Sequence, residues 1–380
     1  MQITSKLPNV GTTIFTVMSQ LARQENALNL SQGFPNFDCS QTLIELVYKH
    51  MKAGGNQYAP MQGVPELREM ICAKMNKLYG SNYQPNTDIT ITAGATQAIY
   101  TAVSSVVQPG DEVIVIEPAY DSYVPAIEMN GGIPVFVQLE APHFTLNWEK
   151  VRAKVNEHTR MIIINTPNNP TGAIFSETDL KALESIVADS NIFVLSDEVY
   201  EHLTYDGKTH ESVAKYPKLR ERSFISYSFG KVFHVTGWRI GYCLAPSKLM
   251  AEFRKIHQFE VFSINRPMQM GLADFLKNEE NYLSLPNFFQ RKRDLALEAL
   301  QDSPFEIIPS AGTYFQLLQY GHLSQELDTD YAVRLTKAIG VASIPISAFY
   351  HDNRDDKIIR LCFAKTDELL LEASRRLSTL

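Results

Sequence analysis

Short strand-like segments and helical segments alternate through the middle of the chain, from about residue 88 to residue 245. Two of the strand-like segments, Met161–Ile164 and Ile192–Leu195, are unbroken apolar runs, which is typical of strands buried on both faces of a sheet. This alternation predicts an α/β fold with a mostly parallel sheet flanked by helices. The candidate strands are Ile89–Thr92, Val113–Glu117, Pro134–Gln138, Met161–Asn165, Ile192–Ser196, Phe224–Ser228 and Ile240–Ala245.

The two ends of the chain carry different patterns. An amphipathic stretch over Thr12–Arg23 lies near the start, and a helical pattern over residues 247–300 breaks near Ser263–Pro267. The segments after it read as two strands, Gly312–Leu317 and Lys357–Cys362, and as a terminal helix, Asp367–Leu377. We expect three parts, namely an N-terminal arm over residues 1–32 that joins the small domain, a large domain over 33–275, and a small α+β domain over 276–380.

The composition is that of an ordinary globular protein, with 44% hydrophobic residues, 20% charged residues and a net charge of −7. No block of Lys or Arg indicates a nucleic-acid or membrane-surface partner. The four cysteines are far apart and form no CxxC pair, which argues against a metal site or a disulfide framework. Residues Met1–Val10 do not have the apolar core of a secretory signal. The sequence also contains no apolar run of the roughly 20 residues that are needed to span a bilayer. We therefore expect a soluble, cytoplasmic protein.

Reactive side chains follow the ends of several candidate strands. Asp197 comes directly after one strand, Tyr200 lies three residues later, Asn169 follows another strand, and Lys231 follows a third. Because ligands of open α/β sheets bind beyond the carboxyl ends of the strands, these side chains are expected to share one pocket. They supply what pyridoxal 5′-phosphate needs: an amine for an imine link, a carboxylate for the pyridine nitrogen, and donors for the ring oxygen.

In this hypothesis each residue has a defined task. Asp197 keeps the ring positive, while Tyr200 and Asn169 bond the ring oxygen and so lower the pKa of the imine. Lys231, once displaced by substrate, is the base that moves a proton between the substrate α-carbon and the cofactor. Simpler interpretations exist: a helix cap for Asp197, a plain turn for Asn169, and a solvated surface side chain for Lys231. Their occurrence together and in this order favours the cofactor.

The phosphate group needs donors and positive charge. Gly94, Ala95 and Thr96 lie between a strand and the start of a helix, where free backbone N–H groups and the helix dipole favour an anion. Ser228 and Arg239 would add a hydroxyl and a guanidinium group.

Two more residues are candidates for ligand contacts. Tyr120 follows a strand at a position suited to stacking on the pyridine ring, with core packing as the alternative. Arg360 lies between Ile359 and Leu361 on a late apolar strand. It is interpreted as a bidentate receptor for a substrate α-carboxylate, with a structural salt bridge as the alternative.

With these residues in place, the chain resembles the class I/II aminotransferases of fold type I over essentially its full length. Within that family it is similar to the branch of kynurenine aminotransferases, glutamine transaminase K and bacterial methionine aminotransferases. The likeness is carried by Ser5–Pro8, Gly11–Phe15, Asn29–Pro35, Asn56–Met61, Asp197–His202, Ser228–Lys231 and Ile359–Lys365.

The resemblance implies an enzyme that moves the amino group of methionine, or of another large uncharged or aromatic amino acid, to a 2-oxo acid. It also implies a homodimer with shared active sites, in which Tyr58 reaches the phosphate of the neighbouring subunit. Gly33 would lie beside the substrate, and Ile14, Phe15, Tyr58 and Ile264 would select its side chain. Thr96 stands where the kynurenine-type pattern usually has an aromatic residue.

Other functions remain open at this point. β-Elimination from cysteine conjugates and kynurenine or glutamine transamination would use the same residues. A cofactor-binding gene regulator would need a DNA-binding module, for which residues 1–30 are too short and insufficiently basic. A nicotinamide-dependent dehydrogenase is disfavoured because no Gly-x-Gly-x-x-Gly follows the early strands.

Overall fold

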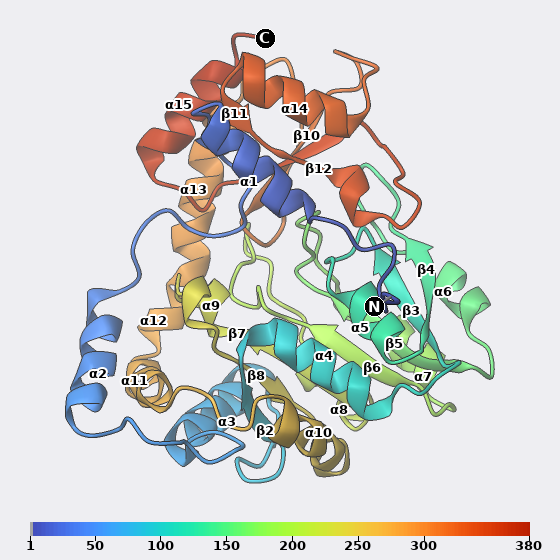
Figure 1. Ribbon diagram of the computed structural model, residues 1–380, viewed down its shortest axis with the longest axis vertical. Coiled ribbons are helices and arrows are strands. Elements are labelled where there is room, and N and C mark those ends of the chain that lie inside the picture. The colour runs from blue at the N-terminus through green and yellow to red at the C-terminus, as the bar shows by residue number, and fades with distance from the viewer. Residues whose placement is uncertain (1–2) are drawn as a thin grey trace.

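A seven-stranded sheet forms the centre of the protein in the computed structural model, which describes residues 3–380 (Figure 1). The spatial order of its strands is β2-β8-β7-β6-β5-β3-β4. The strands are β2 (Ile89–Thr92), β3 (Glu112–Glu117), β4 (Ile133–Gln138), β5 (Thr159–Asn165), β6 (Phe193–Asp197), β7 (Ser223–Ser228) and β8 (Gly241–Leu244). All seven candidate strands are present, and their ends differ from the predicted ones by no more than two residues.

The sheet is mostly parallel, as predicted. β4, β3, β5, β6 and β7 run parallel, and β8 is antiparallel to both of its neighbours, β7 and β2. Alternate residues of β5 enter two different cores: Met161 and Ile163 face one, while Ile162 and Ile164 face the other. Burial on both faces explains the unbroken apolar run in this strand.

Helices cover both faces of this sheet (Figure 1). The break predicted near Ser263–Pro267 is present between α10 (Ser247–Glu260) and α11 (Arg266–Leu276), and the side chain of Asn265 caps α11 by accepting a hydrogen bond from the Met268 N–H. The helices are α2 (Gln41–Lys52), α3 (Pro65–Tyr79), α4 (Gly94–Val106), α5 (Tyr123–Met129), α6 (Trp148–Lys154), α7 (Glu177–Val187), α8 (Pro217–Arg220), α9 (Phe229–Val232), α10 (Ser247–Glu260), α11 (Arg266–Leu276) and α12 (Glu280–Leu283).

A second, antiparallel sheet of four strands lies near the C-terminus, in the order β12-β13-β10-β9. The predicted strand at Gly312 begins only at Phe315, because Thr313 adopts a left-handed conformation with φ of +66° that interrupts an extended chain. The elements here are α13 (Leu285–Ala299), β9 (Glu306–Ile308), β10 (Phe315–Gln319), α14 (Asp328–Ala338), β11 (Val341–Ala342), β12 (Ile344–Pro345), β13 (Ile358–Cys362) and α15 (Asp367–Leu377).

The N-terminal segment packs against this C-terminal region. Helix α1 (Ile14–Gln24), blue in Figure 1, lies beside α14, and β1 (Leu28–Asn29) pairs in parallel with β11. The division at residues 32 and 275 stays a prediction. Within residues 3–380, no helix combines the length and the apolar character needed to cross a bilayer.

Candidate active site

A cavity of about 100 Å³ lies at the carboxyl ends of the central parallel strands, where β5, β6 and β7 end at Asn165, Asp197 and Ser228. Most of the residues singled out from the sequence for a cofactor meet in it. The lining residues are Ala95, Thr96, Ile99, Tyr120, Asn165, Asn169, Asp197, Val199, Tyr200, Ser228, Lys231 and Arg239.

Asp197 is a buried carboxylate with two unequal oxygens. Its Oδ2 accepts a hydrogen bond of 2.6 Å from the Tyr123 hydroxyl, whereas its Oδ1 is buried and has no partner among the described residues. The side-chain amide of Asn165 donates to the Asp197 carbonyl at 2.8 Å and fixes the backbone. Burial raises the pKa of Asp197 to about 6, against the opposing effect of the Tyr123 hydrogen bond.

Lys231 lies on the short helix α9, and its Nζ donates to the Gly33 carbonyl at 3.1 Å. No carboxylate among residues 3–380 forms an ion pair with it. Desolvation lowers the pKa of Lys231 to about 8, and the nearby cations Arg360 and Arg239 act in the same direction. A substantial fraction of this amine is therefore neutral, and so nucleophilic, in mildly alkaline solution.

Tyr200 and Asn169 face the same space from two different segments. Tyr200 is buried, and desolvation raises its pKa well above the ordinary value, so that its hydroxyl stays a donor. The backbone N–H of Asn169 donates to Asn165 Oδ1 at 2.8 Å, which holds the turn against β5. Tyr120 completes this wall, with its hydroxyl 3.5 Å from Thr96 Oγ1.

An anion cradle is present where α4 begins. No side chain caps this helix, so the backbone N–H groups of its first turn are free for a ligand. Gly94 has a φ of +76°, and a Cβ placed there would lie 2.7 Å from Arg239 Nη2. Glycine thus lets the guanidinium group of Arg239 approach the helix start directly.

A second cavity, of about 260 Å³, adjoins the first and shares Tyr120, Asn169, Tyr200 and Lys231 with it. Gly33 and Phe15, both predicted to contact substrate, line this cavity. The remaining lining residues are Gln32, Phe34, Asp121, Thr236, Phe315 and Arg360.

Arg360 is fully buried on β13 at the edge of the second cavity. Its Nη1 donates to Asn169 Oδ1 at 2.6 Å and its Nη2 to the Ser31 carbonyl at 3.0 Å, while its Nε has no partner. The guanidinium carbon stacks 3.8 Å from the centre of the Phe315 ring. No carboxylate among residues 3–380 is ion-paired with Arg360, so the alternative of a structural salt bridge is wrong.

Four of the predicted residues line neither cavity of the single chain. Gly94 is one of them, and it lies against Arg239 at the start of α4. Tyr58 is 78% exposed and packs edge-on against Phe262, with ring centres 5.3 Å apart. Ile14 and Ile264 line neither cavity. The predicted role of Tyr58 at the phosphate of a neighbouring subunit stays a prediction.

Comparison of the sequence with known proteins identifies its family. Residues 25–377 match the family described as aminotransferase class I and II. The chain belongs to the class I and II aminotransferases. A methionine aminotransferase of Escherichia coli is 49% identical over 377 residues, covering 99% of this chain and 98% of the relative. Human kynurenine–oxoglutarate transaminase 1 is 32% identical over 390 residues, covering 93% and 92%.

Solved structures agree with this assignment. The crystal structure of YbdL from Escherichia coli, described as identifying a methionine aminotransferase function, superposes with a TM-score of 0.98 at 49% identity and covers 100% of both chains. The resemblance and the fold drawn from the sequence are confirmed, and the protein is a pyridoxal 5′-phosphate-dependent aminotransferase acting on amino acids and 2-oxo acids.

The residues present fit that cofactor. The unpartnered Oδ1 of Asp197 can accept a hydrogen bond from a pyridinium N–H, and the amine of Lys231, which has no ion-pair partner, can form an imine with an aldehyde. The cradle at Gly94 and Arg239 suits a phosphate, and a Cβ at Gly94 would obstruct it.

Three residues of this aminotransferase were not found from the sequence. Tyr123 donates to Asp197, Tyr314 donates to the Gly33 carbonyl at 2.6 Å, and Lys365 donates to the Phe34 carbonyl at 2.8 Å. These contacts join segments that are far apart in the chain, so no local sequence pattern predicts them. The one available signal was the position of Tyr123, three residues after Tyr120 and at the start of the helix that follows β3.

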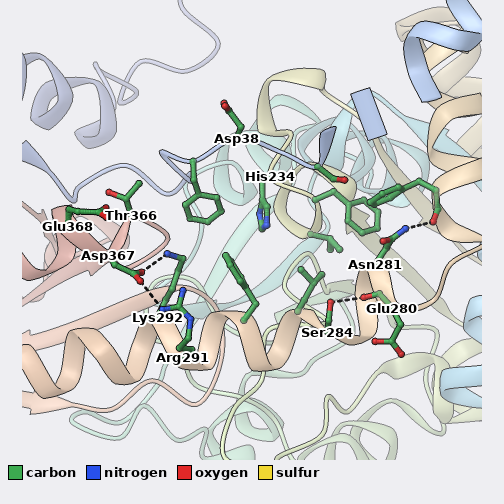
Figure 2. A pocket seen from close by; sticks show the side chains of 17 residues that line it. Asp38, His234, Glu280, Asn281, Ser284, Arg291, Lys292, Thr366, Asp367 and Glu368 are labelled. Carbon is green, nitrogen blue, oxygen red and sulfur yellow. Dashed lines mark hydrogen bonds and ion pairs between the residues drawn. The ribbon is translucent and has the colours of Figure 1, made fainter. Parts of the chain in front are cut away.

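A larger cavity, of about 680 Å³, is lined by Val232, Phe233 and His234, which directly follow Lys231 in the chain. Figure 2 shows Arg291 and Lys292 of α13 bound to Asp367 at one end of this cavity. None of the predicted site residues lines this cavity. The chemistry of its lining, and not its size, therefore distinguishes the smaller cavity as the candidate active site.

Proposed function

We propose that this aminotransferase takes the α-amino group from methionine, or from another large uncharged or aromatic amino acid, and transfers it to a 2-oxo acid. The observation that carries the proposal is the 49% identity to a methionine aminotransferase over 99% of the chain. The lining of the second cavity supports it, because Phe15, Phe34, Tyr120 and Phe315 offer apolar and aromatic surface beside Arg360.

The buried guanidinium of Arg360 binds the α-carboxylate of the substrate in this proposal. Its charge is desolvated and lacks a carboxylate partner, so an incoming carboxylate relieves a buried charge rather than competing with an existing ion pair. Asn169, which accepts from Nη1 at 2.6 Å, orients the guanidinium group toward the cavity that it shares with Lys231.

Lys231 carries the cofactor and, when released by substrate, accepts the proton from the substrate α-carbon at its Nζ. When bound, pyridoxal 5′-phosphate supplies an electron sink for that carbon. With the cofactor bound, Asp197 would hold the pyridine nitrogen, Tyr200 and Asn169 would hold the ring oxygen, and Tyr120 would lie against the ring. The phosphate would be held by Gly94, Ala95 and Thr96 at the start of α4 and by Ser228 and Arg239.

A homodimer is part of the proposal. Tyr58 is exposed together with Phe262 and Phe259, which is 91% exposed, and such aromatic surface is characteristic of a protein interface. Tyr58 of one subunit would then bind the phosphate in the other. Cytoplasmic location is also proposed, supported by the four free cysteines.

The experiment that tests the proposal replaces Lys231. Lys231→Ala is expected to abolish turnover and the visible absorbance of the bound cofactor. Lys292→Ala is the control: Lys292 is a buried lysine, but it donates to the Lys365 carbonyl and Asp367 and lines neither site cavity. Normal transamination by Lys231→Ala would refute the assignment.

Substrate choice is measured with the wild-type enzyme. Cofactor absorbance is followed while twenty amino acids and kynurenine are supplied one at a time without an oxo acid. Methionine is expected to be among the fastest donors. Pyruvate and ammonia released from a cysteine conjugate without an acceptor would instead indicate β-elimination.

A further inference from the structure

The hydroxyl group of Tyr123 makes a direct contact with the proposed pyridine-binding carboxylate. Tyr123 is the first residue of α5 and is 2% exposed. Its hydroxyl donates to Asp197 Oδ2 at 2.6 Å, within the short range of charge-assisted O–H···O⁻ hydrogen bonds. Its ring packs edge-on against the ring of Tyr120, with ring centres 5.8 Å apart. The Tyr123 side chain is therefore fixed both by this packing and by its hydrogen bond to Asp197.

The other carboxylate oxygen is left without a donor. Asp197 Oδ1 is buried and has no hydrogen-bond partner among residues 3–380, although Asp197 lines the 100 Å³ cavity. A buried carboxylate oxygen without a partner destabilises the protein unless a ligand supplies a donor. The Tyr123 hydrogen bond thus divides the two oxygens into one bound by the protein and one free for a ligand.

We propose that Tyr123 is the positioning residue for Asp197, holding Oδ2 so that Oδ1 is presented to the pyridine nitrogen of the cofactor. The inference rests on the proposed role of Asp197 at that nitrogen. Tyr123 does not line the cavity and acts only through the carboxylate.

The charge state of Asp197 supports this role. Burial raises its pKa to about 6, and the Tyr123 hydrogen bond opposes that rise. Removing the hydroxyl therefore raises the pKa further, so more of the carboxyl is protonated near neutral pH and cannot pair with a cationic ring. At higher pH it ionises again. The titratable groups that act on Asp197 are Tyr120, Tyr123, Glu198, Tyr200 and Lys231.

The test measures cofactor affinity rather than turnover. Apoenzyme is titrated with pyridoxal 5′-phosphate at pH 7 and pH 9, and binding is followed by absorbance. Tyr123→Phe keeps the ring and its packing, and it is expected to bind about tenfold more weakly at pH 7 and nearly as tightly as wild type at pH 9. With the analogue in which C–H replaces the ring nitrogen, the variant and the wild type should bind equally.

Tyr227→Phe is the matched control. Tyr227 is also buried, and its hydroxyl donates to the neighbouring carboxylate, Glu198 Oε2, at 2.7 Å. Because Glu198 does not line the site cavities, the control is expected to leave cofactor affinity unchanged, whatever its effect on thermal stability.

The outcomes separate the inference from the function on which it rests. Wild-type affinity of Tyr123→Phe at both pH values, or an equal loss with the carbon analogue, would overturn the inference. In a second experiment, Asp197→Asn should weaken binding of pyridoxal 5′-phosphate. Adding Tyr123→Phe to this variant should cause no further loss of cofactor affinity. An additional loss in this double variant would show that Tyr123 acts independently of Asp197. Unchanged affinity of Asp197→Asn would instead refute the proposed role of that carboxylate.

Discussion

The enclosed cations of this protein differ in their partners. Lys74 and Arg293 are buried and paired with carboxylates, Glu201 for the first and Asp206 and Asp294 for the second. Partly buried Lys231 and buried Arg360 have no carboxylate partner among the described residues. An unpaired cation in a desolvated site is costly, and its pKa falls unless an anion arrives. Lys231 and Arg360 border the same 260 Å³ cavity, where that anion can be substrate.

Cofactor capture by the apoenzyme should follow the ionisation of Lys231. Its pKa is about 8, and only the neutral amine attacks an aldehyde, so below pH 8 the rate is expected to fall about tenfold for each pH unit and to level off above it. Stopped-flow absorbance between pH 6 and pH 9.5 measures this profile, with Lys231→Ala as the blank. A rate that keeps rising until pH 10 would show an ordinary, solvated lysine.

Arg360→Lys should impair substrate binding far more than folding. A lysine keeps the charge but loses the planar fork, so kcat/KM for amino acids is expected to fall about 100-fold, mainly through KM. Arg293→Lys is the matched control, because Arg293 is also buried but pairs with Asp206 and Asp294. That variant should lose stability and retain KM; a similar rise of KM in both would contradict the assignment.

Several site residues could be predicted one by one because of where they stand on strands. Lys231 and Asp197 follow or end apolar strands, and Arg360 interrupts one, so each is conspicuous in the sequence. Tyr123, Tyr314 and Lys365 are not conspicuous, since their roles arise from hydrogen bonds across 74, 281 and 331 residues of chain. The resemblance to aminotransferases, rather than spacing, indicated Gly33.

At the scale of elements, the proposed binding of the phosphate depends on the start of α4. Gly94→Ala would force a left-handed alanine and place its Cβ 2.7 Å from Arg239 Nη2, so the guanidinium group must move away from the helix start. We expect about tenfold weaker binding of pyridoxal 5′-phosphate, measured by equilibrium dialysis of the apoenzyme.

The control for that substitution is Gly110→Ala. Gly110 has a similar left-handed φ of +90°, but a Cβ there would meet nothing within 4 Å. This variant should lose about 1–2 kcal/mol of unfolding free energy and keep its cofactor affinity. Equal affinity losses in the two variants would mean that backbone strain, and not the displacement of Arg239, is the cause.

Strands β3 and β5 of the large sheet were predictable because each is buried on both faces and contains an unbroken run of apolar residues. The short elements were less so. Strands β11 and β12 have two residues each and are held by pairing with β1 and β13, so their own sequences contain too little pattern. The late start of β10 follows from the left-handed conformation of Thr313. The sequence does not predict this conformation, because threonine rarely adopts it.

At the scale of the whole molecule, the two ends of the chain meet around the active site. The Cys362 N–H donates to the Leu30 carbonyl, and Lys365 donates to the Phe34 carbonyl, so the segment containing Gly33 is anchored to the C-terminal region. Tyr58, in contrast, points to solvent at the surface of the single chain. A complete site would then contain residues from three distant parts of one chain and from a second copy.

Subunit mixing tests this sharing directly. Lys231→Ala inactivates the site of its own subunit, and Tyr58→Phe weakens phosphate binding in whichever site Tyr58 serves. If Tyr58 serves the partner subunit, a mixed dimer of the two variants has one intact site, with Lys231 from one subunit and Tyr58 from the other. Random reassociation of equal amounts should therefore restore about a quarter of wild-type activity at limiting cofactor.

The control is to mix each variant with itself, which yields no intact site. Sedimentation at the same concentrations establishes that dimers are present and have exchanged. If Tyr58 acted within its own chain, the mixed dimer would hold one site without Lys231 and one without Tyr58, and activity would not exceed the average of the two parent variants. That result, or a protein that sediments as a monomer while fully active, would contradict the shared site. Activity above the average of the parent variants instead requires Tyr58, which is 78% exposed in the single chain, to contact the active site of the partner subunit.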